Sequence, residues 1–266
     1  MSKTARRTVV VVACVASFIG ARSAQAQTDC YVESDTYSMN LCLSDRGNVI
    51  RFESPVGIQQ IAGGEEGYIL CDATTGAVYH DTGTMQDGFG APTIIEPNGR
   101  NTFPFIVVRT TVDGQFTMTQ TFARGRQRTT GDRELKIQTD VANNTGTSHQ
   151  LHLTRYVNAD INGSPLHDIF GRTRDSLLAW ESATEVGDKA NGLAMISLDW
   201  RAGTRPHASV EEYPGTRTAC GASSLTTPTH GTNLVGELTH DGVVGPKGTG
   251  KKGSDHLTTV IAYRRF

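Results

Sequence analysis

The segment 149–168 carries the densest set of side chains that could do chemistry. As an extended strand, residues 149–157 place Leu151, Leu153 and Val157 on one face. The opposite face then carries a polar row, which consists of His152, Thr154, Tyr156, Asn158 and Asp160. On this row His152 is a candidate acid or base near neutral pH, with Tyr156 to orient it. The alternative is a solvated sheet face whose groups hydrogen-bond across strands.

Arg155 differs from its neighbours because it falls on the apolar face of the same strand. A charge on a core-facing side needs a partner. A buried structural ion pair is our first interpretation, and a clamp on a substrate carboxylate is the second. The second interpretation adds Arg155 to His152 and Tyr156 as candidate catalytic residues.

The segment 158–164 has oxygen-bearing side chains at every second residue, followed by a glycine. This matches the opening of an EF-type calcium loop. The match ends at position 12, where Ile169 stands in place of the bidentate glutamate. Two alternatives stay open: a calcium site of another geometry that uses Asp160, Asn162 and Asp168, or a plain turn built by Asn and Gly. Calcium is the one cofactor that the sequence suggests.

Aromatic side chains supply the other candidate binding groups. Trp180, Trp200 and Tyr213 are suited to act as platforms for a ligand such as a glycan. The segments 201–232 and 241–255 are polar and rich in Gly and Pro, so we expect long loops there. Long loops on a rigid scaffold are common places for binding.

The elements that must position these groups are strands almost throughout. Two alternating runs flank Asp113-Gly114, which is a strong hairpin signal. A second hairpin is predicted around residues 143–146, and no twelve-residue window shows a helical apolar stripe. The sequence therefore predicts an all-β fold, a large antiparallel β-sandwich with little helix. Later strands are expected at 176–180, 193–200, 234–238 and 257–263.

Residues 106–200 combine long antiparallel hairpins, polar loops and a central strand that ends in Arg155-Tyr156-Val157-Asn158-Ala159-Asp160-Ile161. This pattern resembles the large supersandwich domains of the galactose-mutarotase-like class. The resemblance implies a supersandwich-like fold and a carbohydrate ligand. Because it is a resemblance of strand pattern alone, it assigns no catalytic residues.

The N-terminal 26 residues have the order of a secretory signal peptide. Lys3, Arg6 and Arg7 precede an apolar run at 9–21, and Ala24-Gln25-Ala26 forms a small-x-small cleavage site. The apolar run is too short to span a bilayer as a helix, and no other run approaches the required length. We therefore expect residues 1–26 to be removed and 27–266 to form one β-sandwich domain that is secreted or periplasmic.

The charge balance of residues 27–266 argues against a nucleic-acid partner. The first 26 residues hold four of the 25 Lys and Arg residues, which leaves 21 against 27 Asp and Glu residues. A mildly acidic chain with interspersed charge has no electrostatic footprint for nucleic acid.

Four cysteines remain beyond the leader, an even number in an oxidising compartment. We favour the pairs Cys30–Cys42 and Cys71–Cys220 among the three pairings that four cysteines allow. A zinc site is disfavoured because no two cysteines have the usual C-x2-C spacing.

Two functions follow from these features. The first is a secreted β-sandwich protein that binds an extracellular carbohydrate or another partner. The second is a carbohydrate-active enzyme of lyase, epimerase or glycosidase type, which uses the polar strand face around His152. The first is favoured because no catalytic motif stands out, and a fold alone confers no activity.

Overall fold

The computed structural model describes a chain built almost entirely of β-strands. The described residues are 29–32, 39–44, 46–57, 59–61, 66–81, 88–126, 133–159, 161, 168–173, 175–181, 192–199, 206–212, 220, 229–230, 234–248 and 255–265. These ranges contain no α-helix, and hence none of the length and apolar character needed to cross a membrane. The predicted signal peptide at 1–26 lies outside them.

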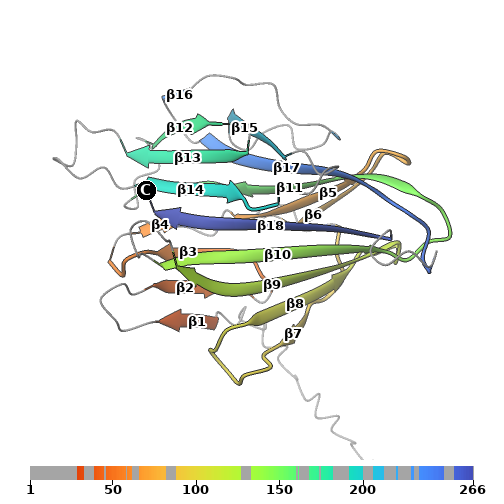
Figure 1. Ribbon diagram of the computed structural model, residues 1–266, viewed down its shortest axis with the longest axis horizontal. Coiled ribbons are helices and arrows are strands. Elements are labelled where there is room, and N and C mark those ends of the chain that lie inside the picture. The colour runs from red at the N-terminus through yellow and green to blue at the C-terminus, as the bar shows by residue number, and fades with distance from the viewer. Residues whose placement is uncertain are drawn as a thin grey trace, which may run out of the picture.

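The strands form three antiparallel sheets, which confirms the predicted all-β class (Figure 1). In spatial order, the four-stranded sheet contains β1 (Asp29–Val32), β2 (Asn40–Leu43), β3 (Val49–Glu53) and β4 (Gln59–Ile61). The five-stranded sheet contains β15 (Pro206–Glu212), β17 (Leu234–Val244), β11 (His149–Val157), β5 (Glu66–Asp72) and β6 (Ala77–Asp81). The nine-stranded sheet contains β16 (Thr229–His230), β12 (Asp168–Arg172), β13 (Ser176–Glu181), β14 (Gly192–Ser197), β18 (His256–Arg265), β10 (Arg133–Asn143), β9 (Phe116–Arg126), β8 (Phe105–Thr110) and β7 (Thr93–Ile95).

Local sequence accounts for the hairpin between β8 and β9. Gly114 has a φ of 76°, a conformation that glycine adopts without steric cost, and it follows Asp113 at the predicted turn. The strands on either side pair in register from Phe105 opposite Phe122 to Thr110 opposite Thr117. The hairpin predicted from Asp113-Gly114 is therefore confirmed. The second hairpin, predicted around residues 143–146, is wrong, because the chain passes there from β10 of the nine-stranded sheet to β11 of the five-stranded sheet.

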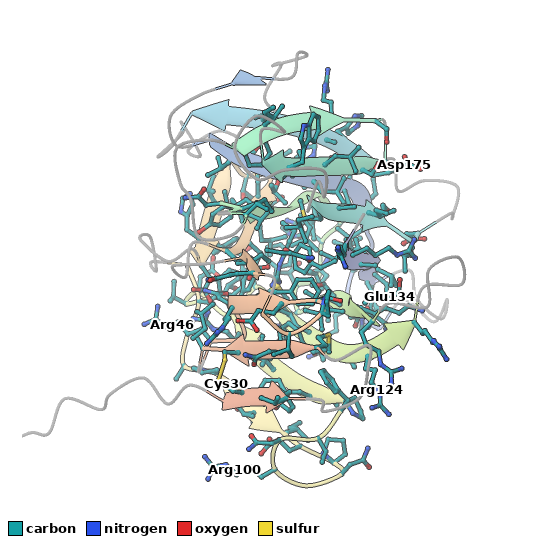
Figure 2. The ribbon with its side chains drawn as sticks, turned by 90° about the vertical axis from the view of Figure 1, so that its left-hand side faces the viewer. Cys30, Arg46, Arg100, Arg124, Glu134 and Asp175 are labelled. Atoms are coloured by element: carbon teal, nitrogen blue, oxygen red, sulfur yellow. A yellow bond between two sulfur atoms is a disulfide. The ribbon has the colours of Figure 1, made fainter. Side chains whose placement is uncertain are left out.

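The nine-stranded sheet turns one face toward both smaller sheets. Ile137 of β10 shares a buried apolar cluster with Phe52 of the four-stranded sheet. Val141, further along β10, shares a second cluster with Leu151 of the five-stranded sheet. Figure 2 shows side chains packed between the orange strands of the four-stranded sheet and the yellow-green strands β9 and β10 of the nine-stranded sheet. The fold is thus a sandwich in which two small sheets make up the second layer.

Both predicted disulfides are present. Cys30 and Cys42 lie directly opposite each other on β1 and β2, with Cα atoms 4.1 Å apart. Cys71 of β5 is bonded to Cys220, and their Cα atoms are 5.4 Å apart. Two disulfides are compatible with an extracellular or periplasmic location.

Glu66, at the start of β5, connects all three sheets from a fully buried position. Its carboxylate accepts hydrogen bonds from the Tyr263 hydroxyl of β18 at 2.7 Å and from the Val49 amide of β3 at 2.6 Å. It also forms an ion pair with Nε of Arg155 on β11. Burial raises the pKa of the Glu66 carboxyl, and the Arg155 guanidinium opposes that rise.

Candidate functional site

Three neighbouring strands of the five-stranded sheet, β15, β17 and β11, carry polar side chains on the face turned away from the core. The inward positions are apolar, because Leu153 of β11 and Ala208 of β15 belong to the two buried clusters. Alternation along each strand then turns His152 and His207 to the opposite, outer side. His152 stands directly opposite Asp241 of β17 in the strand register.

Asp241 joins two histidines on this outer face. Its Oδ1 lies 2.5 Å from Nδ1 of His152, and its Oδ2 lies 3.1 Å from Nε2 of His207. The side chains of His152, Asp241 and His207 are 22 %, 28 % and 51 % exposed. A carboxylate held between two imidazoles has a fixed orientation, and the exposure leaves all three groups within reach of a ligand. We call these three residues the His–Asp–His cluster.

Further along the same face, away from the cluster, the polar side chains are more buried. The hydroxyls of Thr154 on β11 and Thr239 on β17 are 2.7 Å apart. One step further, the Ser209 hydroxyl donates to Oε2 of Glu237 at 3.1 Å. Thr239, Glu237 and Ser209 are all buried. Their hydrogen bonds therefore stiffen the same strands next to the exposed His–Asp–His cluster.

Tyr156 lies in this buried part, opposite Glu237 of β17 and Gly67 of β5. Its ring is only 1 % exposed, whereas His152 on the same strand face is partly accessible. Buried and partly exposed residues alternate along β11 only up to Arg155. From Arg155 to the end of the strand the residues are buried on both faces. Tyr156 is four positions along the strand from His152, a distance of about 13 Å. Their register does not bring the two together as the acid–base couple that the sequence suggested.

Arg155 points to the other side of β11, into the core. Only 5 % of it is exposed, and Glu66 is its ion-pair partner. This is the buried ion pair that its apolar surroundings required. Arg155 and His152 therefore lie on opposite faces of the sheet, and the strand does not present them to one ligand.

The two carboxylates whose side chains the structure describes on this face are not spaced as a paired acid and base for glycoside hydrolysis. Asp241 and Glu237 are four residues apart on β17. At about 3.3 Å per residue their separation along the strand is about 13 Å. Paired glycosidase carboxylates lie roughly 5 to 10 Å apart. The outer face offers an imidazole with a carboxylate partner instead.

Of the three predicted aromatic platforms, the structure describes Trp180, which lies away from this face. Leu177 and Ala179 of β13 belong to the core cluster, so Trp180 lies on the outer side of the nine-stranded sheet. Its ring passes over Gly171 of β12, where an added Cβ would lie 2.9 Å from ring carbons. Trp200 and Tyr213 lie outside the described residues, although Tyr213 directly follows the last residue of β15 in sequence.

The predicted calcium ligands are only partly within the described chain. Asp160 and Asn162 lie outside it, and Asp168 is described as the first residue of β12, without its side chain. Within the described ranges, no three His, Cys, Asp or Glu side chains are grouped so as to hold a metal ion. The calcium site at 158–168 remains a prediction.

Sequence reasoning missed two members of the cluster, His207 and Asp241. Both fell in segments expected to be loops, whereas β15 lies inside 201–232 and β17 extends to Val244. A signal for β15 was present, because Ala208 and Val210 alternate with His207 and Ser209. The surrounding glycines and prolines hid this short run.

A separate cleft of about 300 Å³ lies between β1, the loop before β8 and β9. The rings of Tyr31 and Phe103 meet there at a centroid distance of 4.9 Å. Figure 2 shows Arg124, which also lines the cleft, toward the end of the molecule opposite Asp175. The volume of this cleft is at the lower end of the range for small-molecule sites, so the cleft is a second candidate place for a ligand.

Comparison with known proteins bears on the fold and not on these residues. No family model matches the chain, and no curated protein matches it in sequence. A solved bacterial glucoamylase complexed with acarbose matches in structure with a TM-score of 0.55 and 12 % sequence identity. The match covers 90 % of this chain and 33 % of that one, so the chain spans about a third of the length of the glucoamylase. The chain is thus similar in fold to part of a carbohydrate-acting enzyme, and its place in the galactose-mutarotase-like class stays a prediction.

Proposed function

We propose that this protein is exported and binds an extracellular carbohydrate on the outer face of β15, β17 and β11. The observation that carries the proposal is Asp241, held between His152 and His207 on an accessible sheet face. A fixed carboxylate can accept from sugar hydroxyls while each imidazole offers a further donor or acceptor. A few such convergent polar groups on a rigid scaffold are typical of small-ligand sites.

Two further observations support the proposal. One structural neighbour is a glucoamylase whose solved complex contains acarbose, which makes a carbohydrate the favoured ligand class for a related fold. The predicted leader at 1–26 and the two disulfides agree with work outside the cytoplasm. Trp200 and Tyr213 remain predicted aromatic contacts for the ligand, and Trp180 would serve only a ligand on the opposite layer.

A glycan array probed with residues 27–266 tests the proposal, followed by calorimetry with the glycan that binds. Asp241→Asn and His152→Ala should each weaken binding at least tenfold, because each removes an oriented polar group from the site. Arg124→Ala, in the separate cleft, is the matched control and should leave the affinity unchanged. Loss of binding in Arg124→Ala alone would move the site to that cleft, and an array without any bound glycan would reject carbohydrate binding.

A second function, carbohydrate-active enzyme, is favoured by the short contact between Nδ1 of His152 and Asp241. A carboxylate on one imidazole nitrogen orients the ring and leaves Nε2 to exchange a proton with a substrate. The bound glycan should then be recovered as a cleaved or epimerised product. Asp241→Asn should then lower kcat by about 10²-fold or more, beyond its effect on binding, because Asp241 orients the imidazole that exchanges the proton. Recovery of the glycan unchanged would leave binding as the function.

A further inference from the structure

The two apolar clusters of the core are separated by a buried polar layer. In the nine-stranded sheet Gln120 of β9 stands opposite Thr139 of β10, which stands opposite Thr259 of β18. All three are buried, at 1 %, 6 % and 3 % exposure. Side chains of the five-stranded sheet face Thr139 and Thr259 across the sandwich. We call this layer the polar belt, and its members are Gln120, Thr139, Thr259, Tyr68, Arg155 and His240.

A small cavity lies within the polar belt. Its volume is about 10 Å³, and Tyr68, Arg155 and His240 line it from the five-stranded sheet. Thr139 and Thr259 line it from the nine-stranded sheet. To hold one water, a cavity needs about 10 to 15 Å³ of space open to the centre of a water molecule, together with two to four polar partners. The cavity meets both requirements.

Buried polar atoms in the belt lack partners within the described chain. Arg155 uses Nε for Glu66, but its Nη1 and Nη2 are buried with no hydrogen-bond partner among the described residues. The side-chain amide nitrogen and oxygen of Gln120 are also buried with no hydrogen-bond partner among the described residues. Each such group left unsatisfied costs about 1 to 3 kcal/mol, and in native proteins they are almost always satisfied. The belt therefore requires a polar occupant that can accept from a guanidinium.

The charges of the belt favour a neutral occupant. Arg155 is already paired with Glu66, and the neighbouring Arg109 is paired with Asp81. Burial lowers the pKa of His240 to about 4, so its imidazole is neutral at ordinary pH. No net positive charge is left to hold an anion against the cost of its desolvation.

We propose that the polar belt is an internal hydration site. At least one ordered water occupies the cavity between the sheets, where it accepts from the Arg155 Nη groups and bonds to the hydroxyl of Thr139 or Thr259. The site is independent of the carbohydrate face, because Arg155 and His240 turn inward while His152 and Asp241 turn outward.

A crystal structure at about 1.5 Å or better, paired with a bromide soak, tests the occupant. The expected result is a single density peak without anomalous signal, within roughly 2.7 to 3.2 Å of an Arg155 Nη atom and a threonine hydroxyl. A bromide anomalous peak would show an anion site and overturn the proposal. A well-ordered cavity without density, or rotated side chains that satisfy one another directly, would overturn it too.

Thr259→Val gives a second test that depends on the sign of its effect. The two side chains have nearly the same shape, so in a dry cavity the substitution would be neutral or stabilising. With a bound water it removes a hydrogen-bond partner, and the Tm should fall by about 2 to 4 °C. Thr121→Val, on the outer side of β9, is the control and should leave the Tm nearly unchanged. Because either threonine can bond the water, Thr139→Val is measured beside it, and a Tm equal to or above that of the control for both variants would contradict the hydrated cavity.

Discussion

The Tyr263 hydroxyl donates to Glu66 Oε1 at 2.7 Å, although 197 positions separate the two residues in the chain. Glu66→Gln leaves the Arg155 guanidinium buried without its counter-charge and should lower the free energy of unfolding by about 3 to 5 kcal/mol. Tyr263→Phe removes only one hydrogen bond and should cost about 1 kcal/mol. Urea denaturation of the three proteins measures both values. Equal losses, or a larger loss for Tyr263→Phe, would mean that Glu66 is not the centre of the contact.

His240 makes stability fall in mildly acidic solution. Its folded-state pKa is about 4, below the ordinary value of 6.5, because burial disfavours the charged ring. The unfolded chain therefore binds a proton between these values while the folded chain does not. The contribution is fully present above pH 6.5 and is lost as the pH falls toward 4, by up to about 3 kcal/mol.

The matched variant for this effect is His240→Gln, which can keep a contact to Ser197 but does not titrate. Free energies of unfolding measured from pH 7.5 to 4 should fall more steeply for the native protein than for the variant. All other histidines are present in both proteins, so the comparison isolates His240. Parallel curves would show that His240 is not held neutral by the core.

The two disulfides should differ in their effect on stability because they close loops of different length. Cys30 and Cys42 are 12 positions apart, whereas Cys71 and Cys220 are 149 apart. On the chain-entropy account the shorter loop contributes about 3 kcal/mol and the longer one about 5 kcal/mol. Replacing both cysteines of one disulfide by Ala, and comparing the urea midpoints of the two variants, shows which disulfide stabilises the fold more. A larger loss from the Cys30–Cys42 pair would show that native-state packing, and not loop closure, sets the effect.

Calcium binding at Asp160, Asn162 and Asp168 would stabilise the fold by mass action. At 100 times its dissociation constant a ligand of the native state adds about 2.7 kcal/mol, which raises the Tm by several degrees. Excess calcium should raise the Tm and chelator should reverse it, with magnesium as the control ion. Asp160→Asn should remove the response. An unchanged midpoint in calcium would leave the segment as a plain turn of Asn and Gly.

Strand pattern predicted the fold class, and the cysteine count predicted the two disulfides, because the turn signals and the even number of cysteines can be read directly from the sequence. The turn at Asp113-Gly114 specifies its hairpin through two residues, and an even set of cysteines in an exported chain implies pairing. By contrast, β15 was missed because its alternation over Ala208 and Val210 is short and lies among residues typical of loops. Local propensity cannot show that such a run is held in place by β17.

The candidate site was predictable only in part, because register decides which side chains meet. His152 was placed on the correct strand face, but its partner Asp241 lies 89 positions away. The polar belt shows the same limit, since Gln120, Thr139 and Thr259 align only when β9, β10 and β18 pair in their particular register. Tyr156 illustrates the converse, because a polar group on the predicted solvent face is covered by tertiary structure.

The position of β18 has a consequence for the order in which the molecule can be assembled. It is the last strand of the described chain, yet it lies in the middle of the nine-stranded sheet, between β14 and β10 (Figure 1). During synthesis, the block β7–β10 and the block β12–β14 have no common strand until residues 256–265 have emerged. Either block would meanwhile expose an unpaired edge and half of a core. A nascent chain of this protein thus depends on protection from premature association until its final strand closes the sheet.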